Sequence, residues 1–131
     1  MNADTATEGR RKIHVFTDLE AWKVAHSLVV SIYEVTKNYP KEEQFGIVNQ
    51  MRRAAVSITS NIAEGFSRQS LKEKLQFYAI AQGSVTELQN QLLISRDVGF
   101  LSPDVYNSVD LLIVRVHKLI NGLSKYLKNL R

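Results

Sequence analysis

The chain has 131 residues, the length of a single domain, and 44% of them are hydrophobic and 23% charged, as in an ordinary globular protein. It contains no cysteine, which excludes disulfides, thiolate zinc sites and cysteine nucleophiles. No apolar run reaches the length of a membrane span, and the net charge is +4. We therefore expect a cytoplasmic protein that has no membrane partner.

The positive charge is unevenly distributed along the chain. Residues 1–65 carry eight basic and eight acidic side chains, whereas no acid follows Asp110. Five basic residues follow that position: Arg115, Lys118, Lys125, Lys128 and Arg131. A basic C-terminal helix is a candidate contact for nucleic acid. The alternative is that a modest surplus of lysine only keeps a helical protein soluble.

Residues 1–15 are expected to form a flexible N-terminal tail, because they offer no periodic apolar pattern. The first helix is predicted over residues 18–38. Thr17 and Glu20 have the spacing of a capping box at its start, and Tyr39-Pro40 ends it. Its apolar residues cover so wide an arc that it needs neighbours on two sides.

The second helix is predicted from residue 43 or 45 to 66. Its apolar positions share one arc of the helix: Ile47, Met51, Ala54, Ile58 and Ile62. A polar stripe occupies the nearly opposite arc: Arg53, Ser57, Ser60, Asn61 and Glu64. Arg53 and Glu64 are too far apart along the axis to pair, whereas Glu64 can pair with Arg68. We interpret the stripe as a candidate interface or pocket, or as a polar network that fixes the register of the helices.

The third helix is predicted to begin after Ser70, which starts a second capping box, and to be closed by Gly99. Gly83 lies inside this helix, where glycine costs about 1 kcal/mol relative to alanine. We expect close approach of another helix to compensate for it. The fourth helix is predicted to follow Ser102 as N-cap with Pro103 at its first position.

Connections between these segments are short, which makes consecutive helices antiparallel neighbours. No segment alternates with the period of a strand. The fold class predicted for residues 16–131 is therefore all-α, an antiparallel up-down-up-down four-helix bundle.

Signals for catalysis are missing from the sequence. No Glu-x-x-His, HExxH or phosphate-binding glycine motif is present, and His14, His26 and His117 are scattered, so we interpret them as surface residues. We predict no catalytic residue, metal or cofactor and a non-enzymatic protein, while a small-molecule role of the polar stripe stays open. Among the aromatic residues, Tyr126 is a mild candidate for stacking on a base.

The sequence resembles the four helix bundle protein family, also called 23S rRNA intervening-sequence proteins. The resemblance covers residues 16–128 and is strongest over residues 50–65, QMRRAAVSITSNIAEG. Other matching positions are Asp18, Leu19, Trp22, Ala25, Ile32, Tyr33, Pro40, Arg68, Lys72, Glu73, Tyr78, Gly83, Ser84, Glu87 and Leu88. Thr59 departs from the family, which often has a proline there.

The resemblance implies a bacterial four-helix bundle that assembles into a ring-shaped homo-oligomer, with a pentamer as the expected form. It also implies association with RNA. A related group of proteins serves as accessory subunits of reverse transcriptases in diversity-generating retroelements, as basic pentameric barrels. An adaptor that binds such an enzyme and its template RNA is therefore the alternative function.

Candidate nucleic-acid contacts follow from the distribution of charge. Arg52 and Arg53 are adjacent and diverge by 100° on a helix, so they cannot both face one groove squarely. The full candidate set is Arg52, Arg53, Arg68, Lys72, Arg115, Lys118, Lys125 and Lys128.

Overall fold

The computed structural model describes residues 12–130, and these residues form four long helices and no strand. The helices are α2 (Glu20–Thr36), α3 (Ile47–Ser67), α4 (Leu71–Asp97) and α5 (Pro103–Lys128), with two 3₁₀ turns, η1 (Phe16–Asp18) and η2 (Lys41–Glu43). This confirms the all-α class and the four predicted helices. The predicted tail lies outside the described residues except for 12–15, which form no helix.

Two serines begin helices as predicted. The Ser70 hydroxyl accepts a hydrogen bond from the backbone N–H of Glu73 at 3.1 Å. The Ser102 hydroxyl accepts one from the N–H of Val105 at 3.2 Å, with Pro103 in the first turn of α5. Each side chain satisfies a donor that the first helical turn leaves without a backbone partner.

Gly99 closes α4, also as predicted, and adopts a φ of 82°. The N–H of Phe100 donates to the carbonyl of Ser95 at 2.9 Å, and the N–H of Gly99 donates to Arg96 at 3.1 Å. This pair of bonds is a Schellman motif, whose left-handed residue is best supplied by glycine. The motif reverses the chain between α4 and α5.

The predicted capping box at Thr17 was wrong. The helix α2 begins at Glu20, and the acceptor before it is Asp18, whose carboxylate receives the N–H groups of His14 at 2.9 Å and Val15 at 3.2 Å. These two bonds lower the pKa of Asp18 below its usual value, because they favour the ionised carboxylate. A charged acceptor in this position stabilises the η1 turn in place of a helix start at Thr17.

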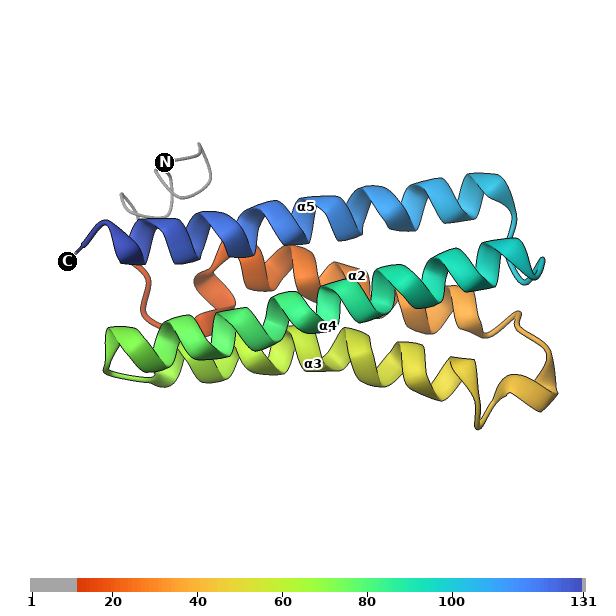
Figure 1. Ribbon diagram of the computed structural model, residues 1–131, viewed down its shortest axis with the longest axis horizontal. Helices are drawn as coiled ribbons and strands as arrows, with labels where there is room; N and C mark the ends of the chain where they lie inside the picture. Colours follow the sequence, from red (N-terminus) through yellow and green to blue (C-terminus); the bar gives the residue numbers. More distant parts are fainter. Residues whose placement is uncertain (1–11, 131) are drawn as a thin grey trace.

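Each long helix packs against two others, in the pairs α2–α3, α3–α4, α4–α5 and α5–α2 (Figure 1). The connections α2–α3 and α4–α5 lie at one end of the molecule, and the α3–α4 connection lies at the other end, beside the end of α5. All four helices contribute fully buried apolar side chains, among them Leu28, Ile32, Met51, Ile58, Ile62, Leu88, Leu92, Ile113 and Ile120. The apolar arc predicted for residues 47–62 is thus part of the core, with Ile47 partly buried at its edge.

A close helix contact occurs where the end of α3 meets the start of α4. Gly65 is buried, and a Cβ atom placed on it would lie 2.6 Å from Cε1 of Tyr78 and 3.1 Å from Cβ of Phe77. No side chain fits there without movement of α4. The ammonium of Lys74 adds a further link, since it donates to the carbonyl of Phe66 at 2.8 Å and caps the end of α3.

Gly83 does not behave as predicted. It is exposed in the middle of α4, and no atom of the described chain lies within 4 Å of the position that its Cβ would take. No helix of the same chain therefore approaches it. Gly83 shares the outer side of α4 with Ile80, one turn before it, and Ile94, three turns after it, which are 53% and 44% exposed.

We expect the substitution Gly65→Ala to destabilise the protein by about 1–3 kcal/mol, because overpacking at a close helix contact forces a backbone shift. Urea unfolding followed by circular dichroism measures the change. The penalty should be smaller when Tyr78 is already replaced by leucine, since the clashing ring is then gone. Equal penalties in the two backgrounds would show that the Tyr78 contact is not the cause.

Candidate nucleic-acid interface

The polar stripe of α3 divides into an inner and an outer part. The hydroxyl of Ser57 lies 2.8 Å from that of Ser84 on α4, and the Asn61 amide donates to the Ser57 carbonyl at 2.8 Å and to its hydroxyl at 3.1 Å. These bonds link α3 to α4 at the edge of the core. Ser57 and Asn61 therefore belong to a small polar network in which only the Ser57–Ser84 contact crosses from α3 to α4, and both interpretations of the stripe stay open.

Glu64 pairs with Arg68, as the sequence indicated, at a distance of 3.1 Å between carboxylate and guanidinium. The Arg68 guanidinium also lies 4.7 Å from the centroid of the Phe77 ring. Both charged side chains stay partly exposed, so the pair contributes little to stability. Its consequence is that the charge of Arg68 is already partly neutralised by a carboxylate.

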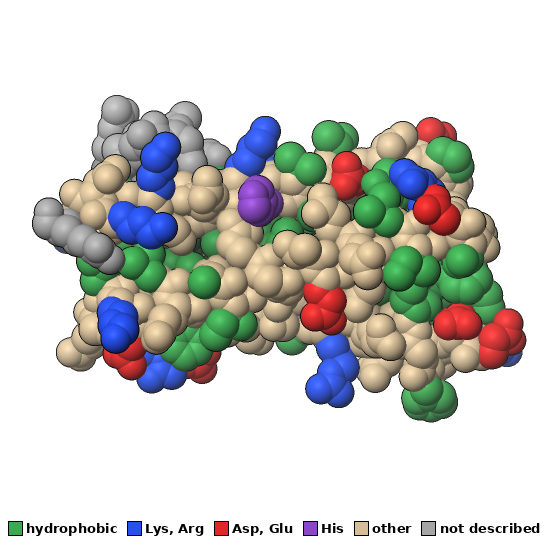
Figure 2. All heavy atoms as spheres, viewed as in Figure 1, with side chains coloured by type: hydrophobic (Ala, Val, Ile, Leu, Met, Phe, Trp, Pro, Cys, Tyr) green, Lys and Arg blue, Asp and Glu red, His purple; other side chains and the backbone are tan. Residues whose placement is uncertain are grey.

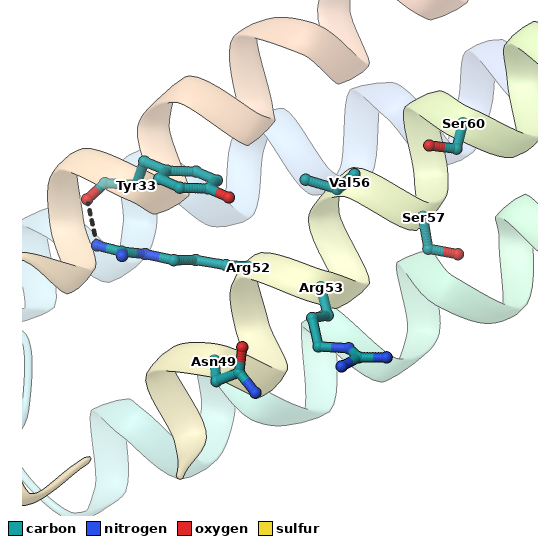
Figure 3. Close-up of a pocket in the computed structure, with 7 residues that line it drawn as sticks. All are labelled: Tyr33, Asn49, Arg52, Arg53, Val56, Ser57 and Ser60. Atoms are coloured by element: carbon teal, nitrogen blue, oxygen red, sulfur yellow. Dashed lines mark hydrogen bonds between the residues drawn. The ribbon is translucent and has the colours of Figure 1, made fainter. Parts of the chain in front are cut away.

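Arg52 and Arg53 point in different directions, as expected for adjacent helical residues (Figure 3). Arg52 reaches α2, where its Nε donates to the hydroxyl of Thr36 at 3.0 Å and its Nη2 donates to the carbonyl of Tyr33 at 3.3 Å. Its guanidinium lies 4.6 Å from the centroid of the Tyr33 ring. Arg53 is exposed and makes no hydrogen bond or ion pair with residues 12–130.

An open groove of about 500 Å³ runs along this part of α2 and α3. We call it the α2–α3 groove, and it is lined by Tyr33, Asn49, Arg52, Arg53, Val56, Ser57 and Ser60. Val56 is the one aliphatic side chain in the lining. Amide, hydroxyl and guanidinium groups share the lining with Val56 and the Tyr33 ring, so the groove fits a ligand that combines a flat apolar surface with polar or anionic groups.

The cations of α5 gather toward the end of the molecule at which α5 terminates and α4 begins. We call this the basic end, and Figure 2 shows lysine and arginine side chains over it, with most of the visible acidic side chains toward the opposite end. Arg115 pairs with Glu20 of α2 at 3.4 Å. Four exposed lysines have no partner among residues 12–130: Lys72, Lys118, Lys125 and Lys128. The candidate set thus contains five unpaired cations, these four and Arg53.

The sequence analysis missed a row of aromatic side chains on α2. The rings of Trp22 and His26 stack with their centroids 4.7 Å apart and their planes 16° apart, and Phe16 meets the Trp22 ring edge-on at 5.5 Å. Tyr33 lies farther along the same side of the helix, because residues 22, 26 and 33 fall within a 40° arc at 100° per residue. The spacing was visible in the sequence, but we counted Trp22 and Tyr33 in the wide apolar arc of the first helix, for which we expected packing neighbours.

The sequence analysis also did not single out Lys74. Its ammonium lies against the last carbonyls of α3, and burial there lowers the pKa of Lys74 below its usual value. It is therefore part of the α3–α4 connection and does not add to the exposed cations.

Within residues 12–130, no group of three or more His, Cys, Asp or Glu side chains is arranged to hold a metal ion. His117 instead faces Gln82 of α4. The Gln82 side-chain Nε2 donates to the His117 backbone carbonyl at 2.9 Å, and the Gln82 Oε1 lies 3.0 Å from the His117 Nδ1. None of the helices in this part of the chain is long and apolar enough to cross a membrane.

The fold and the distribution of charge define a small all-α protein of four helices with a cationic end. The sequence matches the 23S rRNA-intervening sequence protein family over residues 17–122, and the chain belongs to this family. No curated protein matches the chain significantly.

Among solved structures, the chain is similar to a protein of unknown function from the S23 ribosomal protein family of Bacteroides thetaiotaomicron. The two are 22% identical, with a TM-score of 0.75 over 80% of this chain and 95% of the other. At this identity the similarity establishes the fold.

We expect the loss of one partner of the Ser57–Ser84 hydrogen bond to cost more stability than its share in the loss of both, because the pair is partly buried. Replacing either serine alone with alanine should cost about 1 kcal/mol, because the remaining hydroxyl loses the partner on the other helix, whereas replacing both should cost less than the sum. Urea unfolding of the two single variants and the double variant measures this coupling. Additive effects would mean that the two hydroxyls do not depend on each other.

Proposed function

We propose that this protein is a non-enzymatic, cytoplasmic, RNA-associated member of its family. The observation that carries the proposal is the basic end, where the exposed ammonium groups of Lys72, Lys118, Lys125 and Lys128 have no carboxylate partner among the described residues. Unpaired lysines lose no protein contact when they bind phosphate, and they release counterions from the nucleic acid. The membership of a family named for an rRNA intervening sequence supports RNA as the ligand.

The uneven distribution of charge along the molecule supports binding of RNA at the basic end. The end opposite the basic end carries several carboxylates, which repel a phosphate backbone: Glu34, Glu42, Glu43, Asp97 and Asp104. Long-range steering would therefore turn the basic end toward the nucleic acid during encounter. Such an orientation effect weakens as salt screens the charges.

The proposal can be tested with two double variants, each of which reverses two lysine charges, one at the basic end and one at the opposite end. The variant Lys118→Glu/Lys125→Glu should bind a structured RNA about ten-fold or more weakly than the unmodified protein, with a smaller slope of affinity against salt. Its control is Lys37→Glu/Lys41→Glu at the opposite end, which changes the net charge equally and should leave binding within a few-fold. Fluorescence anisotropy of labelled RNA from about 50 to about 200 mM salt reads out both properties. Salt-independent binding, or equal losses in the two variants, would refute the proposal.

Self-association belongs to the same proposal. The bundle would have antiparallel up-down-up-down helices and assemble into a ring-shaped homo-oligomer, for which a pentamer is the proposed form. The exposed face of α4 supports this, because Ile80 and Ile94 are exposed on the side of the helix that carries Gly83, where open space lets a second helix approach closely. Apolar side chains around such a gap are typical of a helix-packing surface.

Light scattering tests the assembly at low and high salt. Unmodified protein should have a mass of several chains, and Ile80→Lys/Ile94→Lys should reduce it to that of one chain, because a charge on this face must lose its water on packing. Leu111→Lys on α5 is the control, since Leu111 is 73% exposed on a different helix. A single-chain mass for the unmodified protein would exclude a ring.

An adaptor that binds a reverse transcriptase and its template RNA is the second candidate. It is favoured by Phe45, which is 94% exposed in the connection between α2 and α3, at the end away from the basic end. A protein partner could bind there while RNA occupies the other end. A neighbouring gene for such an enzyme, together with its co-purification, would favour this candidate over the first.

A further inference from the structure

We infer that the α2–α3 groove binds a short segment of unpaired RNA, whose bases stack along the aromatic row of α2. The inference rests on the RNA association proposed above and adds to it a second site and a ligand class. The aromatic row consists of Phe16 in η1 and Trp22, His26 and Tyr33 on one side of α2. Tyr33 lines the groove itself, and the other three rings continue from it along that side toward the start of α2.

Exposure makes the row usable for stacking. Phe16 and Tyr33 are 37% and 41% exposed. The His26 ring is also exposed, and it stacks on the ring of Trp22. At the other end of the row, the guanidinium of Arg52 lies over Tyr33 and is held there by Thr36. Aromatic rings and fixed guanidinium planes are the groups on which proteins stack unpaired RNA bases.

Charge along the groove agrees with a phosphate backbone. Arg53 lines the groove and has no partner in the described part of the chain. The carboxylates of α2 lie on the side away from the groove and are engaged, Glu20 with Arg115 and Glu34 with Lys37. A strand along the groove would therefore meet a cation and avoid unpaired acids on α2.

The length of the row matches a few nucleotides. Trp22 and Tyr33 are 11 residues apart, which is roughly 16 Å along a helix. A stacked strand rises about 3.4 Å per nucleotide, so about five nucleotides span this distance. Paired RNA would not use such a surface, because its bases are already stacked inside the duplex. The groove therefore predicts that the protein prefers single-stranded RNA to duplex RNA. The basic end alone predicts no such preference.

Trp22 is the single tryptophan of the chain, so its fluorescence reports on this site. The probe is an oligoadenylate of about 12 nucleotides, within the range of known single-strand sites, with a blunt RNA duplex of equal length for comparison. We expect the single strand to quench Trp22 and the duplex to leave it unchanged. Anisotropy of the same labelled RNAs records binding wherever it occurs on the protein.

Substitutions at Tyr33 test the stacking. Tyr33→Leu should weaken single-strand binding about ten-fold and leave duplex binding unchanged, whereas Tyr33→Phe keeps the ring and should restore it. The control Tyr106→Leu removes an aromatic ring near the start of α5, outside the groove and away from the basic end, and should change neither. Arg53→Gln should weaken single-strand binding several-fold with a smaller salt slope.

Each contrary outcome refutes a distinct claim. RNA that binds by anisotropy without quenching Trp22, and with no effect of Tyr33→Leu, would overturn the groove site and leave the basic end intact. Trp22 emission that depends on protein concentration and not on RNA would mean that a second copy covers the groove. Absence of binding to either RNA would overturn both this inference and the proposed function.

Discussion

The close contact between α3 and α4 fixes the rotation of α3, and the α2–α3 groove depends on that rotation. Gly65 lets the two helices meet at Tyr78, and the Ser57–Ser84 bond holds them in register two turns away. Once this face of α3 is committed to α4 and its apolar arc to the core, Arg52 must turn to α2 and Arg53 to solvent. A small shift of α3 along α4 would move every residue of the α2–α3 groove. The groove is therefore a consequence of helix packing rather than of any loop.

Charges in the molecule serve two different purposes. Arg52, Arg68, Lys74 and Arg115 each contact a carbonyl, a hydroxyl, a ring or a carboxylate of the chain, so these cations are already engaged within the fold. Arg53 and the four lysines of the basic end do not. Sequence position separates the two groups poorly, since Arg52 and Arg53 are neighbours with opposite roles. What separates them is the side of the helix on which each residue lies relative to its packing partners.

The sequence predicted the parts of the fold that local chemistry decides. Ser70, Ser102 and Gly99 mark helix ends because a hydroxyl acceptor or a left-handed residue is needed at that place whatever surrounds it. The capping box at Thr17 failed because Thr17 lies inside the η1 turn and α2 begins only at Glu20, where no side chain caps the helix. The Asp18 carboxylate accepts from His14 and Val15 and stabilises that turn. The site was less predictable: the pairing of Glu64 with Arg68 is local and was found, whereas the stack of His26 on Trp22 and the contact of Arg52 with Tyr33 depend on which face of α2 stays open.

Gly83 is a second position at which local sequence could not predict the packing. Its cost in a helix interior led to the expectation of a close neighbour, yet the described chain leaves the space beside it open. A glycine that destabilises its own helix by about 1 kcal/mol without a packing partner in the chain is most simply compensated by a partner outside it. That argument points to the outer face of α4, whereas the groove lies between α2 and α3 and the unpaired lysines lie at the basic end. The three surfaces do not compete for the same residues, so one bundle could associate with its copies through α4 while RNA contacts its lysines and its aromatic row.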